Sequence, residues 1–214
     1  VIGKVGLDIA GKVIQCRAWG HEAAAIFGGK PVNPANAIPG GMSKGLTAAE
    51  RARLEEICRF MVEFGKLTLK ILHEVVLSNQ QYVDLILNGP YYQRTYSMGL
   101  VDEKNRVNYY DGHVRVVDPD GKELCRYAPP EYMNHVAERV EPWSYLKFPY
   151  LKAVGWKGFV DGADSGVYTA TPQSRLNAAD GMNTPLAQEA YEEYFETLTG
   201  DRSGRKPVHY TLAI

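Results

Sequence analysis

The hydrophobic and polar positions predict that the first 90 residues are helical. Apolar side chains of residues 5–27 fall near one helical face, and Gly28-Gly29 supply a stop. A longer amphipathic helix follows the capping-box pattern Thr47-Ala-Ala-Glu50. Its apolar side consists of Leu54, Ile57, Met61, Phe64, Thr68, Ile71, Leu72 and Val75. A further helical segment spans 80–87. Between the first two helices, residues 28–45 are rich in glycine and proline, which predicts a rigid, non-helical connector.

The pattern changes to extended structure over residues 91–127. This stretch is rich in Tyr and Val, and turn-forming residues interrupt it at 102–105, 111–112 and 118–121. Valines that alternate with polar residues between such turns predict a small antiparallel β meander. His113 lies in this meander and is expected to be exposed.

Residues 128–214 read as a mixture of short elements. Pro129-Pro130 introduce a predicted short helix over 131–139, and residues 141–162 predict a packed loop or irregular strands. An extended stretch is expected over 166–177, and Thr184-Pro185 begin a helix over 184–198. Residues 1–214 are therefore expected to form one α+β region that is mainly α, with long helices and an inserted small meander.

Charge and cysteine usage narrow the function classes. Lys plus Arg number 24 and Asp plus Glu 25, so nothing favours a nucleic-acid partner. No apolar run approaches the roughly 20 residues of a membrane span. Cys16, Cys58 and Cys125 are far apart in sequence, which favours a reducing compartment with buried thiols over a disulfide framework.

No complete catalytic set emerges from the residue pattern. No two of the five histidines have helical i, i+4 spacing, and no nucleophile-elbow motif is present. Asp161 and Asp164 flank Gly162, which predicts a tight turn. Arg175 is expected to form a structural ion pair or to contact a partner. An unrelated enzyme built on Asp161, Asp164 and Arg175 is the weakest interpretation.

A group of aromatic residues could line a ligand site, but a role in the core is favoured because aromatic residues dominate core and interface packing. The group consists of Trp143, Tyr145, Phe148, Tyr150 and Trp156.

Several stretches together resemble the large subunit of nickel–iron hydrogenases, in particular the cytoplasmic, methyl-viologen-reducing type that does not reduce coenzyme F420. They keep the family's order along nearly the whole chain. These stretches are GHEAAAIFGGKPVNPANAIPGG, EPWSYLKFPYLKAVGWKGFVDGADSGVY, RLNAADGMNTPLAQEAYEEYFETL and KPVHYTL.

The resemblance implies a fold, a reaction and a set of partners. The parent subunit would hold a nickel–iron centre that reversibly oxidises dihydrogen. Electrons would leave through iron–sulfur clusters of a small subunit, and could pass to a flavoprotein and heterodisulfide reductase. The resemblance also implies a cytoplasmic location.

The chain departs from the family at the metal ligands. The family uses four cysteines, in an Arg-x-Cys-Gly-x-Cys motif and an Asp-Pro-Cys-x-x-Cys motif, and neither occurs here. The chain also begins without Met and ends among apolar residues. We therefore expect the central fragment of a large subunit that lacks both metal-binding ends. It is expected to be inactive alone, with no catalytic, cofactor-binding or metal-binding residue of its own.

One family position can be transferred to the connector. Where the family commonly has His in Gly-Gly-Lys-x-x-His-Pro, this chain has Asn33, which can donate a hydrogen bond but cannot become cationic. The resemblance places this path at the contact with the small subunit; the alternative is a stiff helix connector without a special contact. The candidate contact residues are Asn33, Pro34, Pro39, Gly40 and Gly41.

A second function remains open beside the hydrogenase fragment. Respiratory complex I contains a subunit of related fold without nickel ligands, so this chain could be a non-enzymatic scaffold or subunit-interaction module. In either case, removal of flanking helices would expose apolar faces, so the isolated chain is expected to self-associate.

Overall fold

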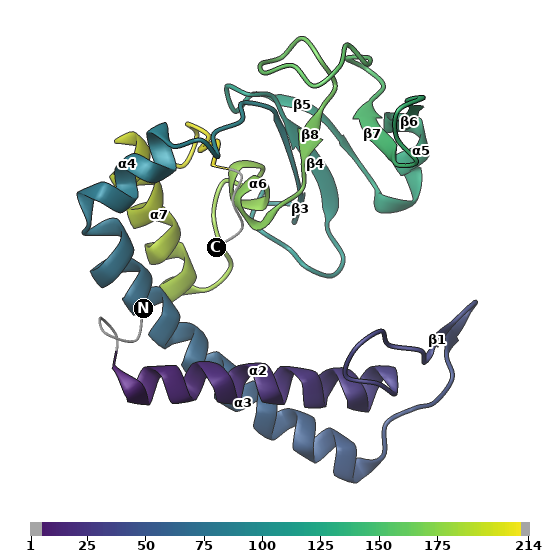
Figure 1. Ribbon diagram of the computed structural model, residues 1–214, viewed down its shortest axis with the longest axis vertical. Coiled ribbons are helices and arrows are strands. Elements are labelled where there is room, and N and C mark those ends of the chain that lie inside the picture. The colour runs from purple at the N-terminus through teal and green to yellow at the C-terminus, as the bar shows by residue number, and fades with distance from the viewer. Residues whose placement is uncertain (1–5, 211–214) are drawn as a thin grey trace. The chain divides into compact units, whose positions relative to one another are not determined.

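The computed structural model describes residues 6–210, which divide into two compact units (Figure 1). Unit 1 ends at Leu72 and unit 2 begins at His73. Helices and small sheets together form the mixed α+β architecture that the sequence predicts.

Unit 1 is built from two long helices, α2 (Leu7–Gly28) and α3 (Ala48–Ile71), joined by the connector. Helix α2 covers the first predicted helix, except that Val5 lies outside the described residues. Gly29 ends α2 with a φ of 79°, a left-handed conformation that favours glycine, and its N–H donates to the Ala25 carbonyl at 2.8 Å. The two helices pack through Trp19 and Phe60, whose ring centroids lie 4.8 Å apart.

Helix α3 begins at the predicted capping box. The Glu50 N–H donates to Thr47 Oγ1 at 3.2 Å, and the Thr47 N–H donates to Glu50 Oε2 at 2.9 Å. Lys44 Nζ adds an ion pair to Glu50 Oε1 at 2.6 Å. The hydrogen bond from Lys44, followed by those from Thr47, lowers the pKa of Glu50 from 4.5 to about 2. The ionised carboxylate is therefore part of the helix start.

The stability that Glu50 contributes should disappear in acid. Because the folded-state pKa is depressed, this contribution is fully present above pH 4.5 and is lost as the pH falls towards about 2. We expect Glu50→Gln to weaken the pH dependence of thermal unfolding, followed by circular dichroism, across that window. Glu63→Gln, which removes an exposed pair with Lys66 on the same helix, is the matched control. Equal pH profiles for Glu50→Gln and the unchanged chain would contradict this role.

Unit 2 has a helical part whose core lies between α4 (Gln80–Asn88) and α7 (Pro185–Thr199), which lie side by side (Figure 1). Both helices fall where the sequence predicts them. The π-helical segment Leu72–Leu77, which follows α3 directly, is not predicted by the apolar spacing. Seven buried residues form the core of this part: Val83, Ile86, Tyr191, Phe195, Leu198, Val208 and Tyr210.

A four-stranded sheet in the order β5-β4-β3-β8 forms the second part of unit 2. Its strands are β3 (Tyr96–Val101), β4 (His113–Val117), β5 (Glu123–Tyr127) and β8 (Tyr168–Thr169). The first three pair antiparallel and confirm the predicted meander, and His113 is exposed as expected. Strand β8 adds a short parallel pairing to β3 that the sequence pattern does not predict.

The predicted helix over 131–139 is wrong beyond its first turn. A 3-10 turn (Pro129–Glu131) and the four-residue α5 (Tyr132–His135) are followed by strand β6 (Val136–Val140). Strand β6 pairs antiparallel with β7 (Lys147–Leu151), so cross-strand pairing outweighs the helical spacing here. Strand β7 lies within the stretch for which a loop or irregular strands were expected.

The predicted extended stretch over 166–177 is also wrong in its second half. Only Tyr168–Thr169 is extended, and α6 (Pro172–Asn177) follows. Thr171 accepts a hydrogen bond from the Ser174 N–H at 3.3 Å, and Pro172 occupies the first helical turn. The Thr-Pro pair is thus a helix start, as it is at α7.

The core role favoured for the aromatic group is wrong for two of its members. Trp143 is 67% and Tyr145 97% exposed. The rings of Phe148 and Trp156 lie 6.0 Å apart, and each also contacts Phe159. These side chains pack against one another near the β6–β7 hairpin.

Candidate functional site

The connector closes back onto the end of α2. The N–H groups of Ala35 and Asn36 both donate to the Gly28 carbonyl, at 2.8 and 3.1 Å. Asn33 has a φ of 54°, in the left-handed region that asparagine tolerates better than most residues. Gly28 is buried, and a Cβ on it would lie 2.4 Å from Pro34 Cβ. Glycine at this position therefore permits the close approach of the returning chain.

The Asn36 side chain links the end of α2 to the residues that follow the connector's hairpin. Its Nδ2 donates to the Phe27 carbonyl at 3.2 Å, and its Oδ1 accepts from Ser43 Oγ at 3.0 Å. Between these contacts, β1 (Ala37–Ile38) and β2 (Gly41–Met42) form a small hairpin. The connector is thus held by hydrogen bonds at its base, which agrees with the rigidity predicted from its prolines and glycines.

The turn of this hairpin is formed by Pro39 and Gly40. Gly40 has a φ of 88°, and proline followed by a residue in this region is typical of a type II turn. The five candidate contact residues, Asn33, Pro34, Pro39, Gly40 and Gly41, are all exposed. Exposed apolar side chains lie within the connector or directly after it: Val32, Ile38 and Met42 within it, and Leu46 just beyond its end. An ordered loop that exposes apolar side chains is suited to contacting another protein.

Arg175 lies on α6 in unit 2. Its guanidinium stands over the Tyr109 ring, 4.7 Å from the centroid. Within residues 6–210 Arg175 makes no ion pair, so the expected structural ion pair is replaced by a cation–π contact. Gly99 on β3 allows this helix to lie close, since a Cβ there would stand 2.9 Å from Arg175 Cα. Asp161 and Asp164 are exposed beside Gly162, whose φ of 96° agrees with the predicted turn.

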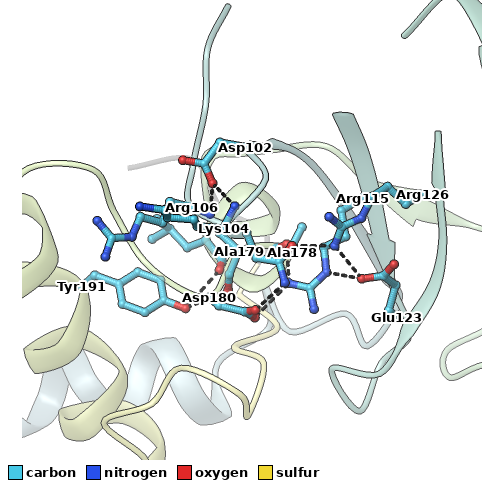
Figure 2. A network of polar contacts seen from close by, with 12 residues as sticks. Asp102, Lys104, Arg106, Arg115, Glu123, Arg126, Ala178, Ala179, Asp180 and Tyr191 are labelled. Carbon is cyan, nitrogen blue, oxygen red and sulfur yellow. Dashed lines mark hydrogen bonds and ion pairs between the residues drawn. The ribbon is translucent and has the colours of Figure 1, made fainter. Parts of the chain in front are cut away.

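A polar network that the sequence pattern does not predict surrounds Arg115 on β4 (Figure 2). Arg115 Nε donates to Glu123 Oε2 at 2.7 Å, and Nη1 donates to Asp180 Oδ1 at 2.8 Å. Nη1 also donates to the Ala178 carbonyl at 3.1 Å. The only sign in the sequence is an arginine between valines in a predicted strand, which suggests a charged side chain at a partly buried position.

Asn177 joins this region to the C-terminal segment. Its Nδ2 donates to Ser97 Oγ at 3.1 Å and to the Val208 carbonyl at 2.8 Å, while its Oδ1 accepts from the Val208 N–H at 3.0 Å. All of these groups are buried, so the bonds are needed to offset desolvation. Strand β3, helix α6 and the segment after α7 are therefore locked together.

Neither a metal-ligand cluster nor a membrane-spanning helix is found among residues 6–210. Within this range, no three His, Cys, Asp or Glu side chains gather as a metal site would require. None of the helices described is long and apolar enough to cross a membrane.

Comparison with known proteins shows that the chain is a homologue of hydrogenase subunits. It is 41% identical over 213 residues to an iron-sulfur subunit of the F420-non-reducing hydrogenase of Archaeoglobus profundus, covering 100% of this chain and 43% of that protein. It is 31% identical over 212 residues to the beta subunit of the NAD-reducing hydrogenase HoxS of Cupriavidus necator, covering 96% and 41% respectively. No protein-family model matches the chain.

The fold agrees with this relationship. A solved NAD+-reducing [NiFe]-hydrogenase in the H2-reduced state has a chain that matches with a TM-score of 0.71 and 26% identity. The match covers 94% of this chain and 42% of the other. The chain thus spans less than half the length of the relatives that it matches.

Proposed function

We propose that the chain is the central part of the large, catalytic subunit of a nickel–iron hydrogenase, whose reaction is the reversible oxidation of dihydrogen. The 41% identity along the whole chain supports the hydrogenase part of this proposal most strongly, although the name of that relative is iron-sulfur subunit. The assignment to the large subunit rests on the sequence stretches that resemble that subunit. The structural likeness to a chain of a solved [NiFe]-hydrogenase also supports the hydrogenase part of the proposal. The parent complex would be cytoplasmic and could pass electrons to a flavoprotein and heterodisulfide reductase.

The described residues do not fit a nickel–iron centre. Nickel in such a site is held by soft thiolates, but the sequence has no Cys-x-x-Cys pair, and among residues 6–210 no three His, Cys, Asp or Glu side chains gather as a metal site would require. Burial also raises the pKa of Cys125, which disfavours its thiolate. We therefore assign no step at the metal to this part of the subunit.

The role that we propose for this segment is to present the connector to the small, iron–sulfur subunit. The connector supplies exposed apolar side chains on a backbone already held by Gly28 and Asn36. A loop ordered before binding loses less conformational freedom in the complex, which favours affinity. In this proposal Asn33 contributes by position and by hydrogen bonding.

Metal analysis of the isolated chain tests this assignment. Plasma mass spectrometry is expected to find no stoichiometric nickel, and dihydrogen-dependent dye reduction on the same sample is expected to be absent. Stoichiometric nickel accompanied by activity would show that the chain holds its own centre, contrary to the proposal.

A second proposal is a non-enzymatic scaffold of the same fold. The lack of a Cys-x-x-Cys pair in this sequence is compatible with it, because such a chain could retain the partner contact without the metal. The gene distinguishes the two proposals. Reading frames that continue into both cysteine motifs support the subunit segment, whereas a start and a stop codon at these ends support the scaffold.

A further inference from the structure

We propose that a cavity beside Arg115 in unit 2 binds a tetrahedral oxyanion, namely free phosphate or the phosphate group of a small molecule. The cavity has a volume of about 340 Å³. The turn after β4, the end of α6 and the loop after α7 contribute to its walls. Three cationic side chains line it: Arg115, Lys122 and Arg205.

Arg115 is held as a pre-oriented donor. The residue is only 8% exposed, and its Nε and Nη1 are engaged by Glu123, Asp180 and the Ala178 carbonyl (Figure 2). Its second terminal nitrogen, Nη2, makes no hydrogen bond within the described part of the chain. Every fully buried side-chain nitrogen or oxygen there has a partner, so Nη2 retains access to solvent. Because Arg115 lines the cavity, Nη2 is the group available to an anion in it.

The two other cations make no direct ion pair with a carboxylate in the described part of the chain, although the charge of Arg205 adds to the hydrogen bonds from Ser203 in lowering the pKa of Asp201. Lys122 and Arg205 are exposed and make no ion pair among residues 6–210. Together with Nη2 they provide donors of the kind that bind phosphate oxygens.

The two carboxylates in the cavity wall are already occupied. Asp120 pairs with Arg94. Asp180 accepts from Arg115 at 2.8 Å and from Asn105 Nδ2 at 2.7 Å. The three cationic side chains in the wall therefore outnumber its two carboxylates, each of which pairs with an arginine, and this favours an anionic ligand over a cation. The volume is at the lower end of ligand pockets, roughly 300–1,000 Å³, so the ligand should be small.

Calorimetric titration of the full chain in phosphate-free buffer of low ionic strength tests the site. Inorganic phosphate and glycerol 2-phosphate are the probes, and saturable binding to one site is expected for at least one of them. Tighter binding of the ester would identify an esterified ligand, and tighter binding of phosphate would identify the free anion. Both outcomes support the oxyanion site.

Variants decide whether the binding occurs in this cavity. Lys122→Ala and Arg205→Ala are each expected to weaken binding by about threefold to fivefold, since each removes one exposed charge. Lys157→Ala, an exposed lysine outside the cavity lining, should leave binding unchanged. Circular dichroism establishes that the variants are folded. Failure of both probes to saturate the protein at millimolar concentrations would overturn the proposal. Equal binding by all variants would also overturn it, because it would indicate an adventitious ion only.

Discussion

A Gly28→Val chain is expected to bind the iron–sulfur subunit about 5- to 150-fold more weakly than the unchanged chain. A side chain at this position would overlap Pro34, because even a Cβ would lie 2.4 Å from Pro34 Cβ and 3.2 Å from its Cα. The segment around Pro34 would therefore be displaced from its packing against Gly28 at the end of α2. Restoring the bound conformation would cost roughly 1–3 kcal/mol, the usual cost of overpacking, and this cost appears as lost affinity.

Gly45→Val is the matched control for this experiment. Gly45 lies in the same connector and is exposed, but no atom outside its immediate neighbours lies within 4 Å of a Cβ built on it. Affinities from surface plasmon resonance should separate the two variants. If Gly28→Val binds as tightly as Gly45→Val, the connector is a helix link and not the contact with the small subunit.

Phe195→Ala is expected to lower the free energy of unfolding by about 3–5 kcal/mol. Phe195 on α7 is 0% exposed and belongs to the core between α4 and α7. Its ring centroid lies 4.7 Å from that of Tyr191 and 5.5 Å from that of Tyr194. Removing the ring leaves a cavity that the buried neighbours on α4, Val83 and Ile86, cannot fill without rearrangement.

Leu186→Ala on the same helix provides the comparison. Leu186 is 44% exposed, so its truncation should change the free energy of unfolding by no more than about 0.5 kcal/mol. Urea unfolding measured by tryptophan fluorescence and circular dichroism would detect both effects. Similar midpoints for the two variants would show that α7 is not packed into the core of unit 2.

The sequence predicted those parts of the fold that depend on local chemistry. The capping box at Thr47 and the Pro185 in the first turn of α7 determine hydrogen bonding within a few residues, so their spacing is visible in the chain. The β meander could be predicted for a similar reason. The alternation of apolar and polar residues and the turn residues between the strands are both local signals. The glycines and prolines of the connector likewise predict a non-helical path, and the structure shows that residues 30–45 form no helix.

Elements that depend on distant partners could not be predicted in the same way. Strand β6 exists because β7 pairs with it, and β8 because β3 lies beside it. In the Arg115 network, Arg115 and its partner Asp180 are 65 positions apart in sequence, so no short motif can predict their contact. The wrong prediction of an extended stretch at α6 has a different cause. Thr171-Pro172 is a local signal for the start of a helix, but the extended pattern of the residues before it favours a strand.

The most direct test of the central claim is the stoichiometry of a complex between this chain and the small iron–sulfur subunit. The two would be co-expressed and analysed by size-exclusion chromatography with light scattering. The proposed function predicts a stable complex with one copy of each chain. Two separate species, with the iron–sulfur subunit folded and its clusters intact, would contradict it.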